Sequence, residues 1–186
     1  MRNTITALAC LLAAPAFATG LQIEIAGEAN GTVTVELLDD IAPQHAEQIA
    51  TLAADGAYDG VVFHRVIDGF MAQTGDVEFG DSTDSKFDIR RAGTGGSKRP
   101  DIPAEFSDVP FDRGVVGMAR SQNPNSANSQ FFIMFDDGHF LNGDYTVVGR
   151  VTDGMDVVDQ IKRGVQSANG AMVGEPDRMV KVTVTD

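Results

Sequence analysis

One arginine stands among the apolar residues of predicted strands, and it is the most unusual chemical feature of the sequence. Arg65 lies in the segment FHRVIDGFMAQTGD. With a side-chain period of two, it shares one strand face with Phe63 and Ile67, while Met71 and Gln73 share a face after the following turn. Taken alone, such an arginine has two interpretations. It is either a surface side chain, whose stem covers apolar area while its charge lies in water or in an ion pair, or it is a functional hydrogen-bond donor.

Other familiar chemistries lack the residues that they need. The three histidines, His45, His64 and His139, form neither an H-x-H pair nor an i, i+4 pair, so the sequence predicts no metal site. The stretch 93–98 lacks the Gly-Lys-Ser/Thr order of a phosphate loop, and no Gly-x-Ser-x-Gly motif is present. We therefore expect no metal, nucleotide or other cofactor, and we expect His64 to be a packed side chain rather than a general base.

The charge balance argues against two classes of partner. The chain of 186 residues has 14 Lys and Arg against 27 Asp and Glu, which gives a formal net charge of −13. Proteins that bind nucleic acid neutralise phosphates with an excess of basic residues, and an anionic membrane surface repels an acidic protein. We therefore expect neither a nucleic acid nor a membrane surface as a partner.

Residues 1–18 have the three parts of a secretory signal peptide. Arg2 precedes an apolar run over 5–14, and an Ala-Phe-Ala triplet ends the segment. A run of this length is too short to span a bilayer as a helix. We expect cleavage after the triplet, a mature domain over 19–186 without membrane insertion, and a periplasmic location. Two alternatives stay open: a buried N-terminal helix, and lipid attachment at Cys10, the only cysteine.

Apolar runs predict eight strands, and two segments with helical spacing predict two short helices. One helix is expected over 43–54, with Pro43 at its first position, and the other between a cap at Asp153 and Gly164. The strands are expected at 21–26, 32–38, 61–67, 70–74, 115–119, 130–135, 145–151 and 179–185. No repeat, linker or second domain is visible, so one folded domain is expected.

The strand at 130–135 constrains the architecture, because its sequence QFFIMF is apolar on both faces after the first residue. Such a strand needs a core on one side and a cover on the other, which favours a closed barrel or a sandwich over an open sheet. The segments 75–110 and 120–129 are rich in Gly, Ser, Asn and Asp. They are expected to be surface loops.

Four motifs, in this order, resemble those of the cyclophilin-type peptidyl-prolyl cis/trans isomerases. They are Phe63-His64-Arg65-Val66-Ile67 with Gly69-Phe70-Met71-x-Gln73-x-Gly75-Asp76, then Gly93-Thr94-Gly95-Gly96, then Ser129-Gln130-Phe131-Phe132-Ile133, and last Leu141-Asn142-Gly143 with Val147-Val148-Gly149. The resemblance covers essentially all of residues 21–185. With the predicted signal peptide at its N-terminus, the chain resembles a periplasmic bacterial member of this family.

The resemblance implies a mainly β fold: a closed eight-stranded antiparallel barrel capped by two short helices, with the active groove on its outer surface. It implies catalytic roles for Arg65, Phe70, Gln73 and Phe132. It further implies that the peptide is held by Met71, Ala119, Arg120, Gln130, Phe140, Leu141 and Tyr145. The expected function is isomerisation of X-Pro bonds in exported polypeptides during folding. Proline-containing clients are the expected partners, and the protein is expected to be a monomer.

The reaction that the resemblance implies suits a chain without cofactors. Rotation about an X-Pro bond must break amide conjugation, against a barrier of roughly 18 to 20 kcal/mol, and it cleaves no bond. As conjugation is lost, the proline nitrogen gains a lone pair, and a guanidinium donor placed there binds the twisted amide better than either planar form. Arg65 presents rigid, permanently charged donors for this step.

Three departures from the family pattern bear on what the groove binds. Arg120 stands where the family usually has Asn, Phe140 where many eukaryotic members have Trp, and Tyr145 where His is usual. Fine substrate preference and binding of the family inhibitor cyclosporin are therefore open. The segment 77–92 is longer than in compact members, which indicates either a solvated loop or a lip that selects clients.

Two other functions remain open at this point. A proline-peptide binding module or holdase chaperone would use the same pocket without useful turnover. The presence of Arg65 favours the enzyme, because binding a proline needs only the pocket. A secreted barrel for small molecules would need a hollow interior, and the apolar strand at 130–135 argues for a filled one.

Overall fold

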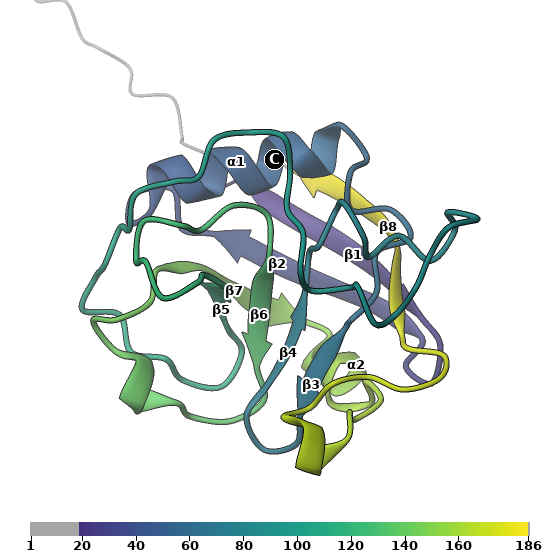
Figure 1. Ribbon diagram of the computed structural model, residues 1–186. Coiled ribbons are helices and arrows are strands. Elements are labelled where there is room, and N and C mark those ends of the chain that lie inside the picture. Colours follow the sequence, from purple (N-terminus) through teal and green to yellow (C-terminus); the bar gives the residue numbers. More distant parts are fainter. Residues whose placement is uncertain (1–18, 186) are drawn as a thin grey trace, which may run out of the picture.

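Eight antiparallel strands form one strongly curled sheet in the computed structural model, which describes residues 19–185 (Figure 1). The predicted signal peptide at 1–18 lies outside the described residues. Across the sheet the strands follow the order β3-β4-β6-β5-β7-β2-β1-β8. Their bounds are β1 (Gly20–Ala26), β2 (Gly31–Leu37), β3 (Arg65–Ile67), β4 (Met71–Thr74), β5 (Val115–Met118), β6 (Phe131–Met134), β7 (Val147–Asp153) and β8 (Arg178–Thr185). All eight predicted strands therefore exist, several of them shorter than expected.

The sheet stays open, so the expectation of a closed barrel is wrong. β3 and β8 are its two edges, and between them the described chain forms only an isolated bridge from Val62 to Arg178. The free edge of β3 is occupied by a later loop, because Val66 donates its N–H to the Gly170 carbonyl and accepts from the Gly164 N–H. β8 cannot pair where this loop already lies. The fold is therefore an open half-barrel.

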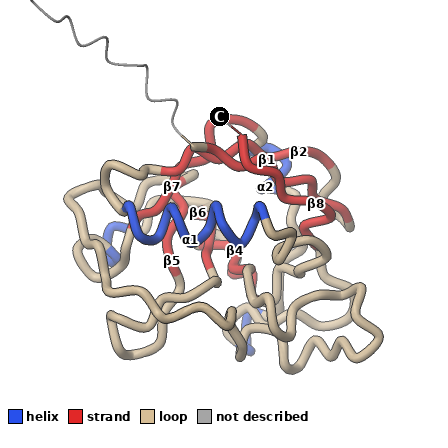
Figure 2. Tube along the Cα trace, turned by 90° about the horizontal axis from the view of Figure 1, so that it is seen from above, coloured by secondary structure: helices blue, strands red, loops and turns tan. Residues whose placement is uncertain are grey.

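The first helix lies across one end of the curled sheet, as Figures 1 and 2 show. α1 (Pro43–Ala54) has the predicted bounds, with Pro43 at its start. Its first N–H groups need acceptors from outside the helix. The Glu105 carboxylate, from a distant loop, accepts from the N–H groups of Gln44 and His45. A side chain far along the chain thus caps a helix that has no capping side chain of its own.

The second helix, α2 (Met155–Asp159), differs from its prediction at both ends. It begins after Gly154, which has a left-handed φ of 84° and is the N-cap in place of Asp153. It stops early because the Lys162 N–H donates to the buried Asp177 carboxylate instead of extending the helix. Two short 3-10 turns, η1 (His139–Leu141) and η2 (Gln166–Ala168), complete the fold. No helix within the described residues is long and apolar enough to cross a membrane.

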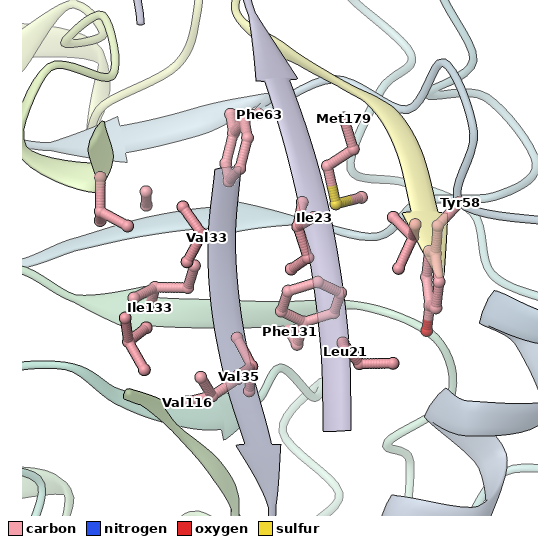
Figure 3. Packing of buried hydrophobic residues seen from close by; sticks show 14 of the residues in the cluster. Leu21, Ile23, Val33, Val35, Tyr58, Phe63, Val116, Phe131, Ile133 and Met179 are labelled. Carbon is pink, nitrogen blue, oxygen red and sulfur yellow. The ribbon is translucent and has the colours of Figure 1, made fainter. Parts of the chain in front are cut away.

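Alternation along the strands builds two apolar clusters, one on each face of the sheet. The first fills the interior, where Ile23 of β1, Val33 of β2 and Phe131 and Ile133 of β6 meet (Figure 3). The second lies on the other face and consists of Met71, Phe111, Val115, Phe132, Met134, Leu141 and Val147. β6 contributes alternate residues to both clusters, which confirms that this strand is covered on both faces.

The segment before Arg65 is not the continuous strand that the sequence predicts. Val61 and Val62 form only isolated bridges, and β3 begins at Arg65. The N–H groups of Val62 and Phe63 donate to two separate segments, at Gly80 and Asp177, so this stretch does not continue the β3–β4 ladder. Phe63 is fully buried in the interior cluster, whereas Arg65 is half-buried on the other face. The two side chains therefore do not share a strand face, contrary to the prediction.

Candidate active site

Cross-strand register places three of the predicted site residues in one row. Arg65 of β3 pairs with Gln73 of β4, which pairs with Phe132 of β6, which pairs with Gly117 of β5. Residues directly opposite one another lie on the same face of a sheet. Position 117 requires glycine because a Cβ there would collide with the rings of Phe132 and Phe111. The row carries a guanidinium, an amide and an aromatic ring across the outer face.

A cavity of about 260 Å³ lies over this row. Ten of the eleven predicted site residues line it: Arg65, Phe70, Met71, Gln73, Ala119, Arg120, Phe132, Phe140, Leu141 and Tyr145. Buried side chains of the second cluster, among them Met71, Phe132 and Leu141, form its apolar surface. Phe140 is 72% exposed. The cavity can therefore take a small apolar ring, with polar groups at one side to orient it.

Contacts between rings hold the aromatic side chains around the cavity. The rings of Phe132 and Tyr145 form a T-shaped pair with a centroid distance of 6.0 Å and an interplanar angle of 81°. Phe132 also stacks on Phe111 at 5.9 Å. The rings of Phe70 and Phe140 lie 5.3 Å apart. Because such contacts restrict the rings, the shape of the cavity is largely formed before a ligand enters.

Three hydrogen bonds hold the Arg65 guanidinium at the wall of the cavity. Nη1 donates to Gln73 Oε1, Nε donates to the Asn169 carbonyl, and Nη2 donates to Asn169 Oδ1, each at 3.1 Å. A guanidinium has five N–H groups, so two remain without a partner among residues 19–185 and can serve a ligand. Partial burial lowers the pKa of Arg65 from its ordinary value, with a smaller opposing effect from Tyr145. The group stays charged at neutral pH.

A chain of side-chain amides continues from Arg65 along the groove. Gln73 donates from Nε2 to Gln130 Oε1 at 3.0 Å, and Gln130 donates to the carbonyls of Gly93 and Gly95 at 3.1 and 2.8 Å. The buried Asp76 carboxylate accepts from the N–H groups of the same two glycines. Gln130 is the one predicted site residue that lies outside the 260 Å³ cavity. It ties the glycine loop to the row of Arg65, Gln73 and Phe132 instead.

Two residues that matter to this geometry have no predicted role. Asp76 belongs to a recognised motif, and only the fold shows that its carboxylate anchors the loop at 93–95. Asn169 lies 104 residues from Arg65 in the chain, and the Asn-Gly pair that it begins signals only a turn. Neither contact could be read from local pattern.

The comparison with known families agrees with this geometry. Residues 21–184 match the family model described as cyclophilin-type peptidyl-prolyl cis-trans isomerase. The chain belongs to the cyclophilin family. Over 155 residues it is 65% identical to a probable peptidyl-prolyl cis-trans isomerase of Brucella suis, which covers 83% of this chain and 78% of that protein. It is 37% identical over 152 residues to peptidyl-prolyl cis-trans isomerase B of Escherichia coli K12, with coverages of 77% and 85%.

Solved cyclophilin structures have the same fold. A cyclophilin from Hirschia baltica gives a TM-score of 0.69 at 27% identity, covering 88% of this chain and 73% of that one. A cyclophilin-type isomerase from Cryptosporidium parvum, solved in the presence of the dipeptide Ala-Pro, gives a TM-score of 0.73 at 24% identity, with coverages of 90% and 99%. Family and named relatives together make this cyclophilin a peptidyl-prolyl cis-trans isomerase.

A second cavity, of about 510 Å³, adjoins the first in this cyclophilin and shares Gln73, Ala119 and Arg120 with it. Arg120 lies over the Tyr145 ring, with Cζ 4.3 Å from the ring centroid, and two of its nitrogens donate to the Asp144 carbonyl. The departure from the usual Asn therefore adds a cation where the two cavities meet.

His64 precedes Arg65 in the sequence, but its side chain is buried. Burial lowers its pKa from 6.5 to about 4, and the positive charge of Arg65 adds to this effect against the opposing Asp76 carboxylate. His64 is thus neutral at physiological pH and packed against Gly93, where a Cβ would collide with the ring.

One group of side chains at the surface has the composition of a metal site. Asp112, Asp137 and His139 each offer a ligand atom, and these atoms lie within 4.8 Å of one another. One oxygen of each carboxylate already has a partner in the protein, since His139 Nε2 lies 2.7 Å from Asp112 Oδ1 and the Arg113 N–H donates to Asp137 Oδ1. That the enzyme needs no metal stays a prediction.

Proposed function

We propose that this cyclophilin accelerates cis/trans isomerisation of X-Pro bonds in exported polypeptides, with Arg65 as the catalytic group. The observation that supports it most directly is the guanidinium with two unused N–H groups at the wall of an apolar cavity. An apolar cavity suits a proline ring, and the related Cryptosporidium protein was solved with a dipeptide that contains proline.

In the proposed mechanism the proline ring lies against Phe132, Met71 and Leu141 while the acyl side of the bond turns. Gln73 fixes Arg65 through Nη1, and Gln73 and Gln130 together offer amide groups to the peptide backbone. Twisting the amide places a lone pair on the proline nitrogen, toward which Arg65 directs its free donors. The planar cis and trans forms lack this lone pair, so the donor stabilises the transition state selectively.

Rate enhancement then depends on one electrostatic contact in a partly buried site. Each ~1.36 kcal/mol of selective stabilisation raises the rate tenfold. Removing one preorganised donor of this kind from an enzyme typically costs about 10² to 10³ in kcat. We therefore expect Arg65 to account for most of the catalysis, with the apolar cavity contributing binding.

The test compares Arg65→Ala and Arg65→Lys with the natural protein in a cis-proline peptide assay. Both variants should fold normally and lose most of the activity. Alanine removes the donor, and a lysine ammonium lacks the planar donor geometry. Arg150→Ala serves as the matched control, since Arg150 is an exposed arginine on β7 away from the cavity. An Arg65→Ala protein that keeps the natural rate would show that Arg65 is not the catalytic group, and the proposed mechanism would be wrong.

The exported setting of the proposal depends on the N-terminal segment, whose Ala-Phe-Ala triplet follows an apolar run. Intact mass of the protein recovered from the periplasm of its native host should correspond to a chain that begins at Thr19. A mass that retains residues 1–18, or a lipidated species at Cys10, would contradict the expected processing.

A further inference from the structure

We infer that Asn169 is a positioning residue that holds the catalytic Arg65 guanidinium in its working orientation. The inference rests on the proposed function, because orientation of Arg65 matters to the rate only if Arg65 is catalytic. It assigns a role in the active site to a residue that does not line the 260 Å³ cavity.

Asn169 meets the guanidinium with two different oxygens. Its carbonyl accepts from Nε and its Oδ1 accepts from Nη2, while Gln73 Oε1 accepts from Nη1. Every nitrogen of Arg65 therefore has a partner, and two of the three partners belong to Asn169. Arginine has a long side chain with many rotamers. A contact at each guanidinium nitrogen restricts these rotamers before the substrate binds, so less conformational entropy is lost on reaching the transition state.

The backbone of Asn169 adopts a conformation that makes this double contact possible. With φ 55° and ψ 39°, it is the one non-glycine residue in the left-handed region among residues 19–185. Asparagine tolerates this region better than most residues, and such positions cluster where function requires them. The left-handed turn brings the carbonyl and the side chain of the same residue toward one guanidinium.

The loop that carries Asn169 is held firmly against the strand that carries Arg65. Val66, the next residue of β3, donates its N–H to the Gly170 carbonyl at 2.8 Å, and an isolated bridge joins Arg65 to Ala171. A Cβ on Gly170 would lie 2.9 Å from the Val66 carbonyl oxygen, so glycine is required for this close approach. The loop and β3 therefore keep a constant separation, and the Asn169 oxygens have a fixed position relative to Arg65.

A neutral partner suits the chemistry better than a carboxylate. Among the described residues no carboxylate lies within ion-pair distance of Arg65. A paired carboxylate would partly neutralise the positive potential of the guanidinium and weaken the attraction of Arg65 for the lone pair of the twisted amide. An amide oxygen and a backbone carbonyl orient the cation and leave its full charge in place.

The experiment compares Asn169→Gly with the natural protein and with Ser167→Ala, a control in the same exposed turn. Glycine keeps the left-handed backbone and the carbonyl acceptor but removes Oδ1. We expect kcat for a cis-proline peptide to fall about three- to tenfold, the effect of one lost hydrogen bond of ordinary strength at an exposed side chain, with KM unchanged. The thermal midpoint should not fall, and Ser167→Ala should change neither quantity.

Nuclear magnetic resonance of the Arg65 side chain supplies a second readout that a purely structural role would not move. The Nη–H signals, assigned by their loss in Arg65→Ala, should exchange faster with water in Asn169→Gly than in the natural protein, because Nη2 loses its Oδ1 acceptor. An unchanged kcat, or a lower kcat with an unchanged Arg65 signal, would overturn the inference.

The two proposals fail in different ways. An inactive natural protein, or an active Arg65→Ala, would refute the proposed function, and the Arg65 signal in Asn169→Gly would still report whether Asn169 orients the guanidinium. An inactive Arg65→Ala beside a fully active Asn169→Gly would refute the positioning role alone.

Discussion

Acidification from pH 7 to pH 5 is expected to destabilise the folded protein through His64. The side chain is 7% exposed, and burial lowers its pKa from 6.5 to about 4. In the unfolded chain His64 regains its ordinary pKa and takes up a proton at pH 5, whereas in the fold it stays neutral. The unfolded state therefore binds more protons in this range, and the free energy of unfolding must fall as the pH falls.

The two pKa values set the size and the pH window of the effect. The stability that depends on a neutral His64 is complete above pH 6.5 and is lost progressively down to about pH 4. The full loss corresponds to roughly 3 kcal/mol, of which roughly 2 kcal/mol is reached at pH 5. For a domain of this size, a loss of about 2 kcal/mol lowers the thermal midpoint by about 4 to 8 °C.

The assay is urea unfolding of the natural protein and His64→Leu between pH 5 and pH 8. Leucine is neutral throughout, so the variant should lack this part of the pH dependence, whatever its absolute stability. His139, whose pKa is raised by the hydrogen bond with Asp112, favours the fold at low pH, but it is present in both proteins and cancels in the difference. Parallel pH profiles for the two proteins would show that His64 is not held neutral and that the reasoning is wrong.

Three further predictions concern the groove, the chemistry and the core. Phe140, 72% exposed beside Phe70, lacks the N–H donor of an indole, so cyclosporin should inhibit the natural protein weakly. Phe140→Trp should raise the affinity for cyclosporin by roughly 5- to 150-fold with little change in the rate of peptide isomerisation. Titration of both proteins with the drug tests this, and no gain in affinity would contradict it. Isomerase activity should be nearly constant from about pH 6 to 8 and unaffected by EDTA, since Arg65 stays charged there; a profile centred on a histidine value, or loss with chelator, would point to other groups. Phe131→Ala should destabilise the fold by about 3 to 5 kcal/mol in urea unfolding, because the ring is 2% exposed and meets Tyr58 edge-on; a loss under 1 kcal/mol would contradict the packing.

Local pattern sufficed for most of the strands and for α1, because side-chain alternation and helical spacing reflect which face each residue buries. The family motifs likewise identified ten residues that the fold brings around one cavity. The limits of α2 could not be read in the same way. Asp177, far along the chain, takes the Lys162 N–H that would have extended this helix.

What the chain alone reveals is therefore the kind of chemistry: a charged donor among apolar strands, and the motifs of one isomerase family. The three-dimensional arrangement decides the rest, because it depends on contacts between distant segments that carry no periodic signal. The loop at 164–172 occupies the edge of β3 and so keeps the barrel open. The same loop brings Asn169 to Arg65 across 104 residues of sequence, and only folding can create that contact.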